Sequence, residues 1–479
     1  MSSLSKNFFY NIILTISGYI FPFLTFPYLT RVLGPEGIGA ANFALSVVDY
    51  AVLFSTLGLG AIGTKEIAKC NNDPQKLNSV FSGLLSLHLM FMTVVALAYF
   101  IVVFSVPQLS GDYRLYLIGF IKIFFNVFLI EWLFQGLQNF KYVTFRSILT
   151  RLLYVIAIFV FVKSREDYWI YILITVLQVC LNALINLQYS RKFVKFEFSF
   201  SHTKKYVLPV VSLGINSILL SFYSTFITMY LGFVNGSEAV GYYTTSTKLY
   251  AIILSIISAF NGVMMPYLNS LYGKGDTGTM KQAIETSMSI VVFVSVPLVM
   301  YCGIMADEII RMIAGPGFER SILPFQVVIG QVILVGISQI TELQILLTMD
   351  KLKTILVITF VSASCSVLIM LGFAEQYAEI SAAYAVMIPH ILECALLLFY
   401  SRKCIRFNFP LKPAITYLLL SLVGGISCII CKHFIVFYWL SIFVSALVMA
   451  LIYLIPLYFM RDSMINMLIK MLKIKPLAK

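Results

Sequence analysis

The chain has 479 residues, of which 60% are hydrophobic and 11% are charged, whereas about 25% of the residues in a soluble domain are charged. Its mean hydropathy is +0.92, so in water it would expose far more apolar surface than soluble proteins tolerate. These values exclude a soluble enzyme, a nucleic-acid-binding domain and a secreted disulfide scaffold. They indicate an integral membrane protein, in which the net charge of +13 is typical of basic cytoplasmic loops.

Long apolar stretches, separated by polar connections with glycine or proline, recur along the whole chain. A helix needs about 20 apolar residues to cross the hydrocarbon core of a bilayer. By this rule the sequence predicts an all-α polytopic membrane protein with fourteen transmembrane helices. The predicted spans are 9–29, 41–63, 80–106, 115–135, 147–163, 168–189, 206–231, 241–268, 287–306, 322–347, 354–373, 378–400, 414–432 and 435–459.

The lysines and arginines predict the orientation of these spans, because short cytoplasmic loops are enriched in them. Twenty-five of the 34 basic residues lie on one side of the membrane, eight lie on the other, and Lys122 lies within a span. Both termini are therefore expected in the cytoplasm.

An internal repeat relates two parts of the chain. The segment Tyr28–Gly39 resembles Tyr230–Gly241 at a constant offset of 202 residues, and Gly60 and Gly262 keep this offset. In both copies the motif connects the first and second spans of a six-span set. Because six is even, the two sets have the same orientation, which indicates a parallel repeat of the kind found in some transporters.

The repeat predicts two parallel six-helix lobes followed by an added pair of helices. The expected parts are an N-lobe at 1–190 (spans 1–6), a basic cytoplasmic linker at 191–205, a C-lobe at 206–405 (spans 7–12), and spans 13–14 with a basic cytoplasmic tail at 406–479.

Motifs for ATP or catalytic zinc are absent from the sequence. It contains neither G-x-x-x-x-G-K-[ST] nor H-E-x-x-H, so ATP is not expected to power the chain directly and no cofactor is expected. Membrane-bound polymerases and glycosyl transferases usually need a sizeable external loop, and the sequence has none. Two lobes without an enzyme motif favour a transporter that works by alternating access.

Ionisable side chains within or beside the spans are the candidate functional residues, since a charge near the bilayer centre costs about 2.5–3.5 kcal/mol on insertion scales. The cationic candidates, which suit an anionic group in transit or the entrance of a cleft, are Arg31, Lys65, Lys122 and Lys248. The acidic candidates for a gate or a coupling-ion site are Asp49, Glu342 and Glu393.

Each candidate also has a structural interpretation. Lys122 can reach the membrane interface with its long side chain, and the carboxylates in lobe two can form hydrogen bonds between helices. Glu131, near the cytoplasmic end of its span, is expected to pair with Lys141 or Arg146.

The repeat places one acid and one base at similar depth. Lys248 corresponds to Ser46, which lies three residues before Asp49 and therefore on the same helix face. We hypothesise that Asp49 and Lys248 form an ion pair when the outward side is closed; the alternative is that each is hydrated separately.

Two motifs in the first lobe carry a likeness to a known family. The segment Pro27–Gly39, PYLTRVLGPEGIG, resembles the first-loop motif of Wzx-type polysaccharide transporters. The segment Glu131–Gln138, EWLFQGLQ, followed by Phe140–Tyr142 and Arg146, resembles a second motif of the same family, although many members carry an acidic residue in place of Gln138. The family belongs to the multidrug/oligosaccharidyl-lipid/polysaccharide exporter superfamily.

This resemblance implies a flippase of the bacterial inner membrane. Such a protein would move undecaprenyl-diphosphate-linked oligosaccharide repeat units to the periplasmic leaflet in surface polysaccharide or O-antigen biosynthesis. It would have a V-shaped cleft lined by spans 1, 2, 7 and 8, with spans 13–14 forming a groove for the lipid tail. The expected partners are the lipid-linked oligosaccharide, membrane lipids, and the polymerase and chain-length regulator of the pathway, but no nucleic acid.

Energy coupling and two alternative functions stay open at this point. The membrane potential alone could drive export of an anion, with H+ or Na+ antiport as an addition. The alternatives are an ion-coupled multidrug exporter of the same superfamily, which usually has twelve spans, and a polymerase or ligase of the polysaccharide pathway.

Overall fold

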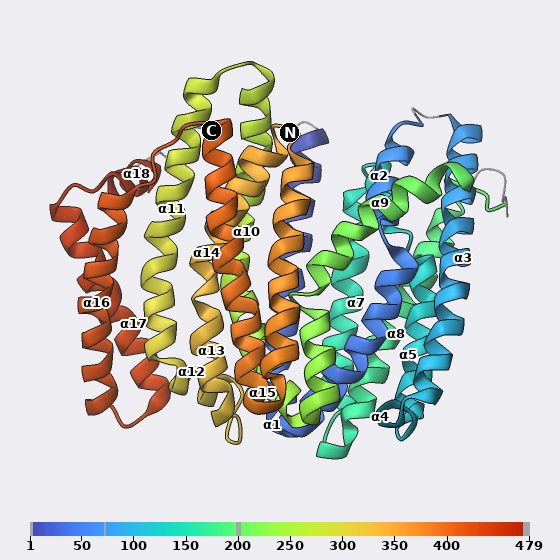
Figure 1. Ribbon diagram of the computed structural model, residues 1–479, viewed down its shortest axis with the longest axis horizontal. Coiled ribbons are helices and arrows are strands. Elements are labelled where there is room, and N and C mark those ends of the chain that lie inside the picture. The colour runs from blue at the N-terminus through green and yellow to red at the C-terminus, as the bar shows by residue number, and fades with distance from the viewer. Residues whose placement is uncertain (1–2, 71–72, 198–202, 473–479) are drawn as a thin grey trace, which may run out of the picture. The chain divides into compact units, whose positions relative to one another are not determined.

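The computed structural model describes residues 3–70, 73–197 and 203–472, and all regular secondary structure within these ranges is helical (Figure 1). Residues 198–202 of the predicted linker and 473–479 of the predicted tail lie outside the description. The elements are α1 (Ser3–Thr56), α2 (Leu59–Ala68), α3 (Pro74–Ser105), α4 (Pro107–Ser110), α5 (Tyr113–Asn126), η1 (Val127–Leu129), α6 (Glu131–Gly136), α7 (Phe140–Phe161), η2 (Arg165–Asp167), α8 (Tyr168–Ser190), α9 (Lys204–Ser221), α10 (Thr225–Gly273), α11 (Thr277–Ile304), α12 (Ala306–Ile313), η3 (Glu319–Ser321), α13 (Ile322–Ile329), α14 (Gln331–Gln339), η4 (Ile340–Leu347), α15 (Leu352–Cys404), α16 (Leu411–Phe434), α17 (Tyr438–Phe459) and α18 (Ser463–Leu472).

Eleven helical segments of the described ranges are long and apolar enough to cross a membrane. Three of them, Ile13–Ala68, Thr225–Gly273 and Leu352–Cys404, have 49 to 56 residues, and each is bent by a residue with non-helical backbone angles. Each is long enough for two crossings at about 1.5 Å per residue. Counting these three twice gives fourteen crossings, so the prediction of an all-α polytopic membrane protein is confirmed.

Two helices that begin in polar connections, α3 and α11, are capped by aspartate. The Asp73 carboxylate accepts hydrogen bonds from the backbone N–H groups of Gln75 and Lys76 at 3.0 and 3.2 Å, next to a proline at the start of α3. The Asp276 carboxylate accepts from the backbone of Thr279 at 2.9 Å at the start of α11, and hydrogen bonds from Thr279 hold the pKa of Asp276 below its usual range. These caps satisfy N–H groups that the helix itself leaves free.

Contacts divide the chain into two compact units. Unit 1 contains the chain up to Thr244 together with Met370–Ala378, and unit 2 contains Thr245–Ile369 and the chain from Glu379 onward. The boundary falls within α10 because α9 packs on α1, α2 and α3, where the backbone N–H of Gly58 donates to Val210 at 3.1 Å. The assignment of lobes to 1–190 and 206–405 rests on topology and stays a prediction.

The sequence repeat is present in the structure as a repeated bend. Gly34 in α1 has φ 67° and ψ −179°, and Gly236 in α10 has φ 81° and ψ −179°. These angles are essentially restricted to glycine, because a Cβ atom would collide with the backbone. The two bends are 202 residues apart, which is the offset of the repeat.

The two copies of the motif cross each other within unit 1. A Cβ atom on Gly39 would lie 1.6 Å from the carbonyl oxygen of Ser237, and one on Gly241 would lie 2.0 Å from that of Pro35. The contact is reciprocal, since Gly39 and Gly241, like Pro35 and Ser237, are related by the repeat offset. Only glycine lets the two backbones approach this closely.

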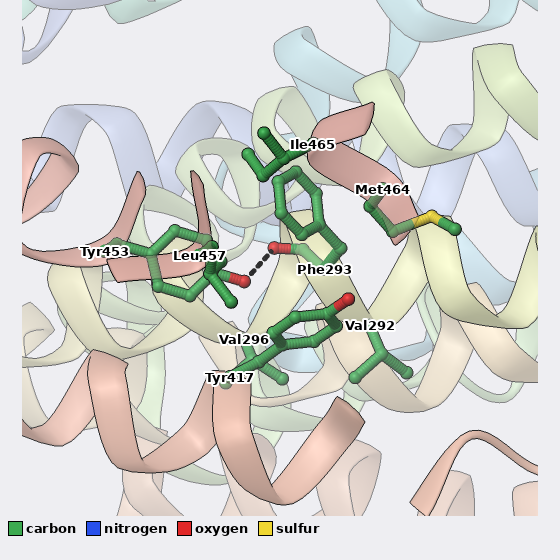
Figure 2. Packing of buried hydrophobic residues seen from close by; sticks show 8 residues of the cluster. All are labelled: Val292, Phe293, Val296, Tyr417, Tyr453, Leu457, Met464 and Ile465. Atoms are coloured by element: carbon green, nitrogen blue, oxygen red, sulfur yellow. Dashed lines mark hydrogen bonds between the residues drawn. The ribbon is translucent and has the colours of Figure 1, made fainter. Parts of the chain in front are cut away.

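In unit 2 the last two spans pack on α11 (Figure 2). The buried cluster consists of Val292, Phe293 and Val296 from α11, Tyr417 from α16, Tyr453 and Leu457 from α17, and Met464 and Ile465 from α18. The Tyr453 hydroxyl donates to the carbonyl of Phe293 at 2.8 Å, so the buried phenol is satisfied. The added helix pair therefore shares a core with the rest of unit 2.

We predict that Gly39→Ala and Gly241→Ala each destabilise the protein by about 1–3 kcal/mol, because the added methyl group must displace a backbone carbonyl. The measurement is thermal unfolding of the purified protein in detergent. Gly372→Ala is the matched control, since a Cβ atom there meets no atom within 4 Å. Equal stability of the three variants would contradict the close crossing.

Candidate functional site

A cavity of about 670 Å³ lies inside unit 1. Its walls come from α1, α2, α3, the η1–α6 segment, α9 and the first turn of α10. Polar side chains interrupt an otherwise apolar lining of leucine, valine and isoleucine. The polar groups that matter most are Asp49, His88, Asn126, Glu131, Gln135 and Ser221.

Two breaks in the membrane helices lie in the wall of this cavity. Leu57, between α1 and α2, has φ 45°, and Ile130, between η1 and α6, has φ 35°. Both residues line the cavity. Because left-handed backbone is rare and strained for leucine and isoleucine, two such residues in one wall single out this region.

Three side-chain pairs connect α1 and α2 with α5 and α6 along the cavity wall. The Lys122 ammonium donates to the Asp49 carboxylate at 2.5 Å. The Thr56 hydroxyl donates to the Oδ1 atom of Asn126 at 3.0 Å. Farther along, the Thr64 hydroxyl donates to the Oε1 atom of Gln135 at 3.3 Å. Since these bonds use only the amide oxygens, the amide nitrogens of Asn126 and Gln135 remain available.

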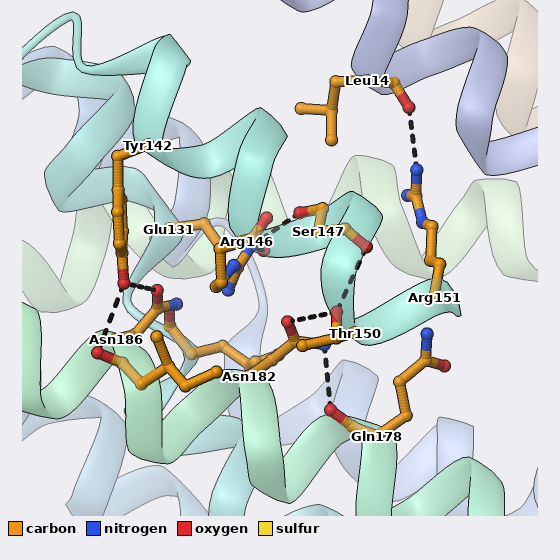
Figure 3. A network of polar contacts seen from close by, with 12 residues as sticks. Leu14, Glu131, Tyr142, Arg146, Ser147, Thr150, Arg151, Gln178, Asn182 and Asn186 are labelled. Atoms are coloured by element: carbon orange, nitrogen blue, oxygen red, sulfur yellow. Dashed lines mark hydrogen bonds and ion pairs between the residues drawn. The ribbon is translucent and has the colours of Figure 1, made fainter. Parts of the chain in front are cut away.

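A second ion pair involves Glu131, another residue of the cavity lining. The Arg146 guanidinium donates to the Glu131 carboxylate at 2.5 Å and to the Ser147 hydroxyl at 3.0 Å. Figure 3 shows this arginine within a polar network that continues to Thr150 and Asn182. The expectation that Glu131 pairs with Lys141 or Arg146 is met by Arg146.

Both ion pairs place the carboxylate toward the cavity and the cation behind it. The Asp49 and Glu131 side chains are 45% and 42% exposed, whereas those of Lys122 and Arg146 are 14% and 3% exposed. No lysine or arginine is among the described residues that line the cavity. The cavity therefore presents acidic and neutral polar groups whose charge is balanced from outside.

His88 is a cavity residue that the sequence analysis did not select. It lies on α3 and is buried, with 3% of its surface exposed, and neither ring nitrogen has a hydrogen-bond partner within the part of the chain that the structure describes. A buried polar group without a partner is costly. The signal was present in the sequence, because His88 lies within the predicted span 80–106 and ionisable residues inside membranes are functional candidates.

The remaining cationic candidates are not among the described residues that line this cavity. Arg31 is exposed on α1, and its guanidinium donates to the carbonyl of Pro27 in the same helix at 2.9 Å. Lys65 is exposed in the last turn of α2, where a cation is favoured by the helix dipole. Lys248 is half-buried on α10 in unit 2. Because Asp49 is in unit 1, its proposed pairing with Lys248 stays a prediction.

The two acidic candidates of unit 2 lie close together. Glu342 is on η4, a π-helical segment, and its charge acts on Glu393 of α15. Neither carboxylate forms a hydrogen bond or ion pair with another described residue. A π-helical turn often marks a functional position. Next to it, Asn261 of α10 bonds to Gln339 at 3.0 Å and Gln344 at 2.9 Å.

Comparison with known proteins assigns the family. The family model described as "Polysaccharide biosynthesis protein" matches residues 4–272, more than half of the chain. The chain belongs to this family. The resemblance drawn from the motifs at Pro27–Gly39 and Glu131–Gln138 is thereby confirmed.

The chain is also similar to two curated relatives. It is 24% identical over 411 residues to the "Putative O-antigen transporter" of Escherichia coli (strain K12). The matched region covers 84% of this chain and 97% of the relative. It is 23% identical over 264 residues to the protein of the same name from Shigella dysenteriae. This match covers 54% of this chain and 65% of the relative.

Solved structures show the fold that this family member shares. The chain resembles the lipid II flippase MurJ in an inward closed conformation with a TM-score of 0.77, 15% identity and coverage of 95% of this chain and 99% of that one. It resembles an inward-facing multidrug resistance MATE transporter with a TM-score of 0.65 and 13% identity. The match covers 80% of this chain and 94% of the transporter. Both are likenesses of fold.

We predict that Asp49→Asn destabilises unit 1 more than Lys122→Met does. Loss of Asp49 leaves a nearly buried lysine without a counter-ion, at a cost of about 3 kcal/mol, whereas loss of Lys122 leaves a carboxylate that is hydrated in the cavity, at a cost of about 1 kcal/mol.

Thermal unfolding of the two single variants and the double variant measures this asymmetry and the coupling between the residues. Lys69→Met is the control, because it removes an exposed ion pair with Glu66, which contributes about 0–1 kcal/mol. The reverse order of stability would contradict the burial pattern of the pair.

Proposed function

We propose that the protein is a transporter that moves undecaprenyl-diphosphate-linked oligosaccharide repeat units from the cytoplasmic to the periplasmic leaflet of the bacterial inner membrane. It would work by alternating access in surface polysaccharide or O-antigen biosynthesis. The repeat units would then reach the polymerase and chain-length regulator of the same pathway. Its role is transport and not catalysis.

The polar cavity within the membrane helices of a polysaccharide biosynthesis protein is the observation that carries this proposal. A lipid-linked glycan needs a polar path for its headgroup, while its hydrocarbon tail stays in the bilayer. The names of the relatives, which describe O-antigen transporters and a lipid II flippase, support a substrate of this class.

The membrane potential supplies a driving force for such a substrate. A diphosphate is an anion, and with a negative cell interior its outward movement gains about 2.3 kcal/mol per charge per 100 mV. Arg31, Lys65 and Lys248 are the cations that we propose to contact the diphosphate. Lys122 has a different role, because its charge is already compensated by Asp49.

Glu342 and Glu393 are the candidates for a coupling site, which would bind H+ or Na+. Two neighbouring carboxylates without a cationic partner favour uptake of a proton or a metal cation. Such coupling would add to the effect of the membrane potential.

A multidrug exporter of the same superfamily is the second candidate. The carboxylates of Asp49 and Glu131 face the cavity, and this arrangement favours a cationic drug. However, Lys122 and Arg146 pair with these carboxylates and so reduce their attraction for a cationic drug.

The leaflet of the lipid-linked glycan in cells that lack the gene tests the proposed function. We predict accumulation of complete single repeat units that an impermeant reagent added to spheroplasts cannot modify, and restoration by the wild-type gene. Single units that the reagent modifies would indicate failed polymerisation instead. Unchanged glycan pools together with drug sensitivity would favour the multidrug exporter.

Transport by the full chain in liposomes tests the coupling site. We predict that Glu393→Gln reduces the response of transport to an imposed proton or sodium gradient about tenfold, because the coupling charge is lost. The response to an imposed potential should persist, since the substrate still carries its charge. Glu375→Gln, at an exposed acid of the same helix, is the control. An unchanged response to both gradients would contradict a coupling role for Glu393.

A further inference from the structure

The cavity of unit 1 contains hydrogen-bonding groups that the protein itself does not use. The Nδ2 atom of Asn126 and the Nε2 atom of Gln135 donate to no described residue, because the hydrogen bonds of these two side chains involve the amide oxygens. Both ring nitrogens of His88 are buried and have no hydrogen-bond partner among the described residues. All three residues line the cavity. Unsatisfied polar groups in such a place indicate a polar ligand.

The charges around the cavity do not suit a diphosphate. Its lining presents the carboxylates of Asp49 and Glu131, whereas the cations Lys122 and Arg146 lie behind them. A diphosphate would approach the two acidic groups before it met either cation, and like charges repel. A neutral ligand with hydroxyl groups would instead donate to the carboxylates.

The size of the cavity and its mixture of groups match a sugar. Ligand pockets usually have about 300–1,000 Å³ and combine apolar walls with a few polar groups that orient the ligand, and this cavity has about 670 Å³. Carboxylates accept hydrogen bonds, and amide nitrogens donate them. A sugar hydroxyl does both, so it can satisfy both kinds of group in the lining.

We infer that the cavity of unit 1 binds the sugar residues of the transported molecule, and that the diphosphate is held elsewhere. Asp49 and Glu131 accept hydrogen bonds from hydroxyl groups, and the ion pairs with Lys122 and Arg146 hold both carboxylates in position. The Nδ2 atom of Asn126 and the Nε2 atom of Gln135 provide the complementary hydrogen bonds. The inference rests on the proposed function, because it divides that substrate between two sites.

The binding of two lipids by the full chain in nanodiscs tests this inference. The probes are undecaprenyl diphosphate and the same lipid carrying N-acetylglucosamine. We expect Gln135→Leu to weaken binding of the sugar-bearing lipid about tenfold, which is the loss of about one hydrogen bond, and to leave binding of the sugar-free lipid unchanged. The control is Gln178→Leu, since Gln178 is a half-buried amide of unit 1 that lines a groove between α7 and α8.

The outcomes separate the two proposals. If Gln135→Leu weakened the binding of both lipids equally, or of neither, the sugar site alone would be overturned. Failure of the wild-type protein to bind the sugar-bearing lipid more tightly than phosphatidylethanolamine would overturn the proposed function and the sugar site together.

A measurement on the wild-type protein covers the case in which Gln135→Leu does not fold. The probe is the sugar-bearing lipid with a photoreactive diazirine on its sugar. We expect cross-links to the segments 126–135 and 217–225, which form the cavity walls. Cross-links confined to unit 2 would overturn the assignment.

Discussion

The crossing of the two repeated motifs is the constraint on which the rest of unit 1 depends. Gly39 and Gly241 let two backbones approach where any Cβ atom would collide with a carbonyl group, and Gly34 and Gly236 bend the chain just before the crossing. The crossing fixes the start of α10 against α1. Because α10 then continues into unit 2, the same four glycines determine where the second half of the repeat begins.

The fold could be predicted from the sequence because its signals are strong and local. Apolar length specifies the spans, and the offset of 202 residues between Gly34 and Gly236 identifies the repeat without any knowledge of contacts. The boundary between the compact units could not be predicted in this way. It depends on the packing of α9 against α1, α2 and α3, and that packing is decided by side-chain shape.

The candidate site was predicted less completely, and for a physical reason. The sequence identifies Asp49 and Lys122 as charges within the membrane, but it cannot show that they neutralise each other at 2.5 Å. It also suggests a cationic substrate cleft, and only the structure shows that Lys122, one of the expected cations, lies behind a carboxylate at the cavity of unit 1. His88 illustrates the converse case, since its role depends on the absence of a partner, and only the fold shows which groups remain unpaired.

Charge distribution gives the two units different chemistry. The two cavity carboxylates of unit 1, Asp49 and Glu131, are each paired with a cation, so they serve best as hydrogen-bond acceptors that are fixed in position. Glu342 and Glu393 of unit 2 have no such partner among the described residues, so a bound cation can alter their charge. In the proposed transporter the two properties would serve different steps, because the proposed sugar site needs acceptors that stay in place and the proposed coupling site needs a charge that bound H+ or Na+ can change.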